Sequence, residues 1–239
     1  MIYSDIPPYE GELAELADLL WDIGAVKIES TANGGGFTLK LHETQPDAPK
    51  SPIFFNLRTA DNPKPGPLDA KALRLIGNVL ADLIITGLVG GFDRIAPIPN
   101  AGDPIAIALH TALAERGLDR PLLWLTKAEE GGKRKISGVR EGEWYNERDI
   151  ALAVDDLITQ AGTKIEAIDV LHQVAIQIVT DLLVLIDRQQ GGREQVEAKG
   201  INVVAAFDLD ILLSYYVATG KMTAEVADEV QAYIKDNQV

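Results

Sequence analysis

The stretch ALAVDDLITQAGTK, residues 151–164, decides the fold class of this chain. An apolar run typical of a buried strand ends at Val154, and two adjacent carboxylates, Asp155 and Asp156, follow directly. A short segment of hydroxyl, amide and glycine residues then leads into a helical pattern from about Thr163. A strand followed by a loop and a helix is the repeating unit of α/β proteins with parallel sheets.

The same alternation continues on both sides of this stretch. Apolar periodicity predicts helices over 11–23, 68–89, 104–116 and 163–174, and two more near the end of the chain. Strands are predicted over 26–28, 36–41, 53–58, 92–99, 121–126, 150–154, 176–187 and 202–207, with a charged loop over 127–148. We therefore expect an α/β fold, a parallel sheet flanked by helices. Three segments are predicted: an N-terminal helix and hood (1–66), the core (67–210) and a C-terminal helical segment (211–239) packing on the hood or the core.

Composition limits the classes of function. The 239 residues include 22 Lys and Arg against 36 Asp and Glu, a formal net charge of −14 that repels nucleic acids and anionic membranes. Cysteine is absent, which excludes disulfides, thiolate metal sites and cysteine nucleophiles. The N-terminus lacks the pattern of a signal peptide, and no apolar run approaches the ~20 residues of a membrane span. We expect a cytoplasmic protein without nucleic-acid or membrane partners.

The loop over 155–163 has two chemically distinct halves. Its acids can accept hydrogen bonds from vicinal hydroxyls and lie close to a developing positive charge. Its second half turns into a helix N-terminus, where unpaired N–H groups and the helix dipole favour an anion. In open parallel sheets, ligands bind at the carboxyl ends of the strands. A sugar that carries a phosphate would satisfy both halves.

The string VDDLITQAGTK resembles the phosphoribosyl pyrophosphate signature of type I phosphoribosyltransferases. Four further stretches resemble segments of the orotate phosphoribosyltransferase family, in the family's order and over residues 13–210: LLWDIGAVKI followed by GFTLK, SPIFFNLR, DRIAPIPNAGDPIAIAL and LIDRQQGGREQVEAKGI. The resemblance implies a Mg²⁺-dependent pentosyltransferase, expected to be a homodimer. It would convert phosphoribosyl pyrophosphate and orotate to orotidine 5′-monophosphate and pyrophosphate in pyrimidine biosynthesis.

The resemblance also implies roles for individual residues. Asp155 and Asp156 would hold the ribose hydroxyls. The loop that binds the 5′-phosphate would comprise Thr159, Gln160, Ala161, Gly162 and Thr163. The loop beneath the pyrophosphate and its Mg²⁺ would comprise Asn100, Ala101 and Gly102. The metal would be held mainly by the substrate. Around the orotate ring the resemblance places Arg188, Lys40, Phe54 and Phe55.

Two departures from the family pattern affect the activity. The family closes its site with a basic loop of pattern RKExKxHG, where this chain has TKAEEGGKRKISGVREGEW (126–144). Lys127 matches the family's first lysine, but two glutamates follow, and basic residues return only at Lys133, Arg134 and Lys135. These three could reach the same phosphates from a shifted position. The second departure is the insertion over 41–50. Because of this insertion, the match of Lys40 to the lysine of the base pocket is in doubt.

Other readings of the same residues stay open. The chain could transfer phosphoribose to another base, or it could bind phosphoribosyl pyrophosphate as a non-catalytic regulatory protein. Taken alone, the two acids could form a solvated turn, and Arg188 could simply pair with Asp187. Adjacent strand residues face opposite sides, so at least one of Phe54 and Phe55 is expected in the core.

Overall fold

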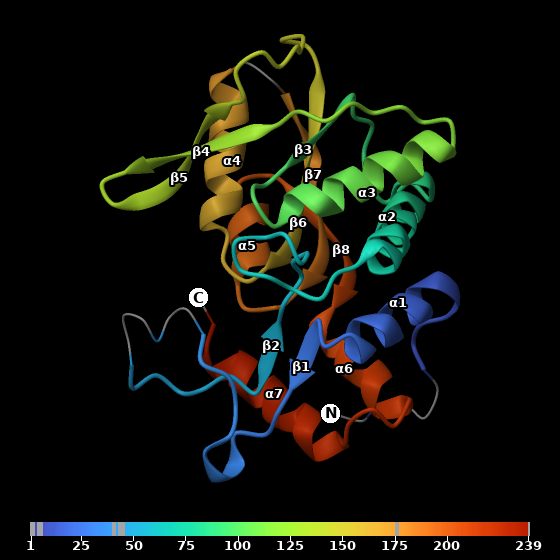
Figure 1. Ribbon diagram of the computed structural model, residues 1–239, viewed down its shortest axis with the longest axis vertical. Helices are drawn as coiled ribbons and strands as arrows, with labels where there is room; N and C mark the ends of the chain where they lie inside the picture. The colour runs from blue at the N-terminus through green and yellow to red at the C-terminus, as the bar shows by residue number, and fades with distance from the viewer. Residues whose placement is uncertain (1–2, 4–6, 40–41, 43–45, 175–176, 239) are drawn as a thin grey trace. The chain divides into compact units, whose positions relative to one another are not determined.

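The computed structural model describes residues 3, 7–39, 42, 46–174 and 177–238. The chain divides into two compact units (Figure 1). The first unit comprises Met1–Asp69 and Asp208–Gln238, and the second comprises Ala70–Phe207. In the described part of the chain, no helix is long and apolar enough to cross a membrane.

The second unit is built on a four-stranded sheet of order β3-β6-β7-β8. Its strands are β3 (Arg94–Pro97), β6 (Ile150–Ile158), β7 (Gln177–Asp187) and β8 (Asn202–Asp208). The β3–β6 and β6–β7 pairs are both parallel. The apolar run 151–154 of β6 is almost fully buried, as expected of a central parallel strand covered on both faces. The prediction of a parallel sheet flanked by helices is confirmed.

Helices cover this sheet on two sides (Figure 1). On one side lie α2 (Ala70–Ile85) and α3 (Gly102–Glu115), and on the other lies α4 (Gly162–Gln173). The short helix α5 (Gly192–Glu197) follows β7. Helices α2 and α3 approach closely at Gly77, where an added Cβ would lie 2.4 Å from the carbonyl oxygen of Ala108. The glycine therefore permits this crossing.

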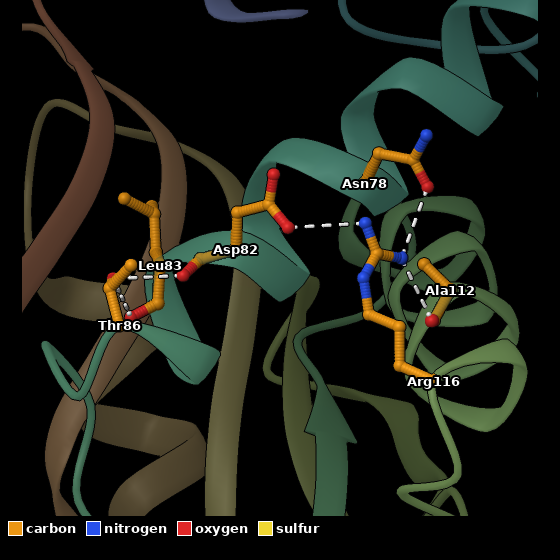
Figure 2. Close-up of polar contacts among 6 residues, drawn as sticks. All are labelled: Asn78, Asp82, Leu83, Thr86, Ala112 and Arg116. Atoms are coloured by element: carbon orange, nitrogen blue, oxygen red, sulfur yellow. Dashed lines mark hydrogen bonds and ion pairs between the residues drawn. The ribbon is translucent and has the colours of Figure 1, made fainter.

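Arg116, directly after α3, ties α3 to α2 (Figure 2). Its guanidinium donates hydrogen bonds to Oδ1 of Asn78 at 3.2 Å and to the carbonyl of Ala112 at 2.9 Å. It also lies 3.1 Å from Oδ1 of Asp82. One side chain thus links the end of α3 to two successive turns of α2.

Three predicted segments of the second unit differ from the structure. The predicted strand 150–154 continues to Ile158, because β6 still pairs with β7 at Ile158 and Asp187; the acids lie inside the strand rather than after it. The predicted strand 121–126 is wrong over 121–124, where the structure has an isolated bridge between Leu122 and Ile95. The predicted charged loop over 127–148 is also wrong in part, since it contains most of an antiparallel hairpin.

The hairpin consists of β4 (Leu125–Glu130) and β5 (Lys133–Val139). Its two-residue turn is Gly131-Gly132, with φ angles of 59° and 75°. Two consecutive positive φ angles fit the right-handed twist of a tight hairpin, and glycine adopts them without strain. Glu129 lies opposite Arg134, so the register pairs residues of opposite charge.

Over its described residues, the first unit holds a small antiparallel pair and three α-helices. Strand β1 (Val26–Ile28) pairs with β2 (Ile53–Phe55), and a 3₁₀ turn, η1, spans Ala32–Gly34. The helices are α1 (Gly11–Asp22), α6 (Leu209–Ala218) and α7 (Ala224–Asp236). The hydroxyl of Tyr216 donates to the carbonyl of Ala17 at 2.9 Å, joining α6 to α1. The predicted strand 36–41 is reduced to a bridge between Phe37 and Ser51 over its described residues.

Candidate functional site

The acid pair lies near the carboxyl end of β6. Asp155 is 4% exposed, and both of its carboxylate oxygens have partners in the protein. Its Oδ1 accepts a hydrogen bond from the backbone N–H of Asp156 at 2.9 Å. Its Oδ2 lies 2.7 Å from Nζ of Lys164, a buried residue in the first turn of α4. Asp155 is therefore turned toward the protein.

Asp156 has a different electrostatic environment. Burial raises the pKa of its carboxyl group well above the ordinary range, and the neighbouring Asp155 raises it further by its charge and by a hydrogen bond. Lys164 acts in the opposite direction and lowers this pKa. A carboxyl group whose pKa is raised and that lies next to a second acid is typical of a functional site.

The loop from Thr159 to Thr163 leads from β6 into α4. Helix α4 starts at Gly162 after Ala161, and no side chain among the described residues caps it. The N–H groups of a helix's first turn have no intrahelical acceptor, so this end favours an anion. An added Cβ at Gly162 would meet nothing within 4 Å, which leaves open space at the crest of the loop. The N–H of Ala161, by contrast, donates to Oε1 of Gln195 at 3.2 Å.

The segments that follow β3 and β7 lie against the carboxyl-terminal half of β6. At the start of α3, a Cβ on Gly102 would lie 2.7 Å from the carbonyl oxygen of Val154 and 3.3 Å from Oδ1 of Asp155. After β7, the N–H of Arg188 donates to the carbonyl of Ile158 at 3.0 Å. The structure thus brings together three predicted segments: Asn100–Gly102, Asp155–Thr163 and Arg188.

Arg188 is only 6% exposed, and it follows a carboxylate that is already engaged. Asp187 lies 2.5 Å from Nε of Arg193 and accepts the N–H of Gln189 at 2.8 Å. Asp187 therefore forms an ion pair with Arg193. The predicted contact of Arg188 with a base stays a prediction.

Asp103 and Lys127 extend the charged cluster. Asp103 lies in the first turn of α3, and its buried Oδ1 accepts no hydrogen bond from the described residues. Burial raises its pKa to about 6, against the opposing charges of Arg140 and Lys127. Burial lowers the pKa of Lys127, against the attraction of Asp155 and Asp103. Lys127 therefore lies in the field of Asp155 and Asp103. Its predicted contact with a phosphate stays a prediction.

The remaining predicted residues belong to the hairpin, to the first unit or to the part of the chain that the structure does not describe. Arg134 is exposed on β5, and the side chain of Lys133 and the whole of Lys40 lie outside the described residues. On β2 of the first unit, Phe55 is buried while Phe54 packs on Phe37 with ring centroids 5.7 Å apart. The expectation that at least one phenylalanine is core is confirmed. The contact of the pair with a base stays a prediction.

Comparisons with known proteins decide the family. No protein-family model matches the chain. It is 35% identical over 136 residues to the orotate phosphoribosyltransferase of Pyrococcus furiosus, covering 56% of this chain and 68% of that protein. The chain belongs to the orotate phosphoribosyltransferase family.

Two other known proteins match almost the whole chain. It is 27% identical over 227 residues to the uridine 5′-monophosphate synthase of Bos taurus, covering 94% of this chain but only 41% of that longer protein. The crystal structure of the Francisella tularensis orotate phosphoribosyltransferase matches the fold with a TM-score of 0.66 at 20% identity, covering 97% of this chain and 99% of that one.

Three residues of the candidate site were not predicted from the sequence: Lys164, Asp103 and Gln195. Lys164 could have been noticed in the sequence, because a cation in the first turn of a helix is unfavourable with the helix macrodipole and is expected to have an acidic partner. Asp103, at the start of a helix, looks like an ordinary dipole-stabilising acid. Gln195 gave no signal, since its hydrogen bond to Ala161 depends on how α5 packs beside the loop.

Proposed function

We propose that this chain transfers a 5-phosphoribosyl group from phosphoribosyl pyrophosphate to orotate, giving orotidine 5′-monophosphate and pyrophosphate. The observation that carries the proposal is the adjacency, at one sheet edge, of an acid pair and an uncapped helix N-terminus with open space in front of it. The acids suit ribose hydroxyls, and the helix end suits the 5′-phosphate. Membership of the family supplies the substrate class.

In the reaction, a ring nitrogen of orotate forms a bond to the anomeric carbon of the ribose. The bond from that carbon to the pyrophosphate oxygen breaks, and its electron pair leaves with pyrophosphate. Positive charge develops on the sugar, where the carboxylates of the acid pair stabilise it. Negative charge develops on the pyrophosphate. Lys127 and the basic residues of β5, Lys133 and Arg134, are the groups proposed to stabilise it.

Mg²⁺ is the proposed metal, and the donor atoms suit it. Carboxylate oxygens and substrate phosphates are the usual ligands of this ion, which retains several waters and seldom needs a protein cage. Among the described residues, no group of three or more His, Asp or Glu side chains could hold a metal by itself. When bound, the ion would neutralise part of the pyrophosphate charge. The loop Asn100–Gly102 lies beneath the proposed position of that group.

The base, the assembly and the location complete the proposal. Arg188 and Lys40 would attract an anionic carboxylated pyrimidine, and Phe54 and Phe55 would lie near its ring. A homodimer working in the cytoplasm is expected from the family resemblance. Sedimentation of the purified chain would test the dimer directly.

The test is a turnover assay with orotate, phosphoribosyl pyrophosphate and Mg²⁺, followed by the ultraviolet absorbance of orotate. We expect loss of orotate that depends on both the donor and the metal. Turnover of uracil or a purine base instead would assign another acceptor. Calorimetric binding of the donor without turnover of any base would favour a regulatory protein. Failure to bind the donor at all would refute the proposal.

A further inference from the structure

The base of the hairpin β4–β5 packs against α4 (Figure 1). Ile136 of β5 is 6% exposed and belongs to the same core cluster as Ala167 and Leu171 of α4. Its backbone N–H donates a hydrogen bond, 3.4 Å long, to Oε2 of Glu166 on the second turn of α4. Among the described residues β5 has no strand neighbour besides β4, so the Glu166 carboxylate accepts a hydrogen bond from an edge of the hairpin that no strand covers.

Lys127 lies directly opposite Ile136 in the register of the hairpin. Residues that oppose each other in an antiparallel pair extend their side chains on the same face, with Cβ atoms about 4.5–5.5 Å apart. The side chain of Lys127 therefore lies on the face of the hairpin that Ile136 buries, and it is half-buried there. The position of the Lys127 ammonium group consequently depends on how β5 is held on α4.

Glu166 can act on Lys127 through its charge or through the backbone of Ile136. Burial lowers the pKa of Lys127, and the charges of Asp155 and then Asp103 oppose this more strongly than the charge of Glu166 does. Other acids thus supply most of the attraction that keeps Lys127 charged. The hydrogen bond from Ile136 needs the length of the Glu166 side chain but not its charge, since an amide oxygen accepts the same bond.

We propose that Glu166 is a positioning residue for Lys127: by accepting the N–H of Ile136 it fixes the base of the hairpin on α4, and with it the ammonium group that meets the departing pyrophosphate. The inference rests on the proposed function and deepens it, because Glu166 itself touches no substrate. Helix α4 begins at the proposed 5′-phosphate loop and holds the hairpin on its second turn. One helix therefore fixes the groups for both phosphate ends of the donor.

Two variants of Glu166 separate the length of the side chain from its charge. Glu166→Gln keeps the length and an oxygen acceptor but loses the charge, whereas Glu166→Asp keeps the charge and withdraws the acceptor by one methylene group. With orotate, donor and Mg²⁺, we expect kcat to stay within about threefold for Glu166→Gln and to fall by roughly 10- to 100-fold for Glu166→Asp, because a catalytic group that is slightly misplaced loses most of its effect.

The affinity for the donor should respond much less than kcat. Lys127 is proposed to act on charge that develops in the transition state, so the dissociation constant of phosphoribosyl pyrophosphate should stay within about threefold in both variants. A Glu166→Asp variant with the kcat of the wild type would overturn the proposal. Equal losses of kcat in Glu166→Gln and Glu166→Asp would also overturn it, because charge and not length would then matter.

A double variant shows whether Glu166 acts through Lys127. In a Lys127→Met background, Glu166→Asp should lower kcat by less than about twofold further, because the group that Glu166 positions is already absent. A merely structural role of Glu166 would lower kcat by the same factor in both backgrounds. Losses that multiply in this way would contradict the proposal.

Amide hydrogen exchange measures the attachment of the hairpin without any turnover. The N–H of Ile136 should exchange about tenfold faster in Glu166→Asp than in the wild type, since its acceptor is withdrawn. In Glu166→Gln the exchange rate should remain that of the wild type. Equal exchange rates in the wild type and Glu166→Asp would overturn the proposal whatever the kinetics show.

Controls separate this inference from folding and from the proposed function. Asp169→Asn removes an exposed charge from the same helix and should change neither kcat nor the exchange of Ile136. If thermal melts show that Glu166→Asp fails to fold, Glu166→Met replaces it, because methionine keeps the length and the helix propensity but offers no oxygen. A wild type that turns over no base would overturn the proposed function, and the exchange rates would still decide whether Glu166 holds the hairpin. A wild type that turns over orotate beside a fully active Glu166→Asp would overturn only this inference.

Discussion

A Cβ atom on Gly192 would lie 2.6 Å from the carbonyl oxygen of Thr159. The glycine that starts α5 is therefore in backbone contact with the first residue of the proposed phosphate loop. The nearby hydrogen bond from Ala161 to Gln195 adds a second tie between the two segments. The position of the loop therefore depends on its contacts with α5 as well as on its own sequence.

The variant Gly192→Ala tests this contact. The backbone of Thr159 must move to accept the methyl group, at a cost of roughly 1–3 kcal/mol in the free energy of unfolding. We also expect the KM for the donor to rise more than the KM for the base. Gly91→Ala is the matched control, since a Cβ there meets nothing within 4 Å. Equal donor KM values for the two variants would argue against the coupling of α5 to the loop.

Asp156→Asn should stabilise the protein at alkaline pH while it weakens donor binding. The folded-state pKa of Asp156 lies above its ordinary value, so between about pH 4 and about pH 8 the folded state binds more protons at this site than the unfolded state does. Its contribution to stability consequently falls as the pH rises through that window. Asparagine removes this term. The melting temperature of the variant minus that of the wild type should increase from pH 5 to pH 9.

The ionised form of Asp156 is the form that accepts hydrogen bonds from hydroxyls. For the wild type, we therefore expect the donor to bind more tightly as the pH rises toward about 8. Calorimetry over this range measures the effect. Asp156→Asn should bind the donor weakly and lose the pH dependence. A variant that keeps the wild-type slope would assign the titration to another group, with Asp103 as the next one to test.

The sequence predicts the order of helices and strands in the second unit well, because each is marked by local periodicity and by glycine or proline at its ends. The sequence predicts the ends of strands less well where they depend on pairing with a distant strand. Strand β6 extends to Ile158 because it pairs there with β7, and no local pattern in the sequence indicates this pairing. The hairpin 125–139 was not predicted, because charged residues such as Glu129 and Arg134 are typical of a solvated loop. Only the pairing register shows that these two residues lie opposite each other.

The candidate site shows the same division. Asp155, Asp156 and the loop to Thr163 are contiguous, so their motif could be recognised in one stretch of sequence. Lys164 adjoins that stretch, but its contact with Asp155 requires the turn of the chain from β6 into α4. Gln195 lies 34 positions after Ala161, and only the fold brings the two together.

Arg116→Met tests the contacts by which Arg116 links α3 to α2. Arg116 and Asp82 are both partly exposed, so their ion pair contributes little, and most of the effect should come from the hydrogen bonds to Asn78 and Ala112. We expect the free energy of unfolding to fall by about 0.5–1.5 kcal/mol, measured by urea denaturation. Arg74→Met, at an exposed position of α2, should change it by less than about 0.5 kcal/mol.

Lys127 and Arg134 lie on opposite strands of the hairpin and should differ in their effect on catalysis. Lys127 is half-buried within the field of Asp155 and Asp103, whereas Arg134 is exposed and lies opposite Glu129. If Lys127 stabilises the departing pyrophosphate, Lys127→Met should lower kcat by roughly 10²- to 10³-fold, since the interaction strengthens in the transition state. Arg134→Gln should lower kcat far less. Single-turnover kinetics with orotate would measure both, and a larger loss for Arg134→Gln would show that the tip of the hairpin, and not its base, carries the phosphate contact.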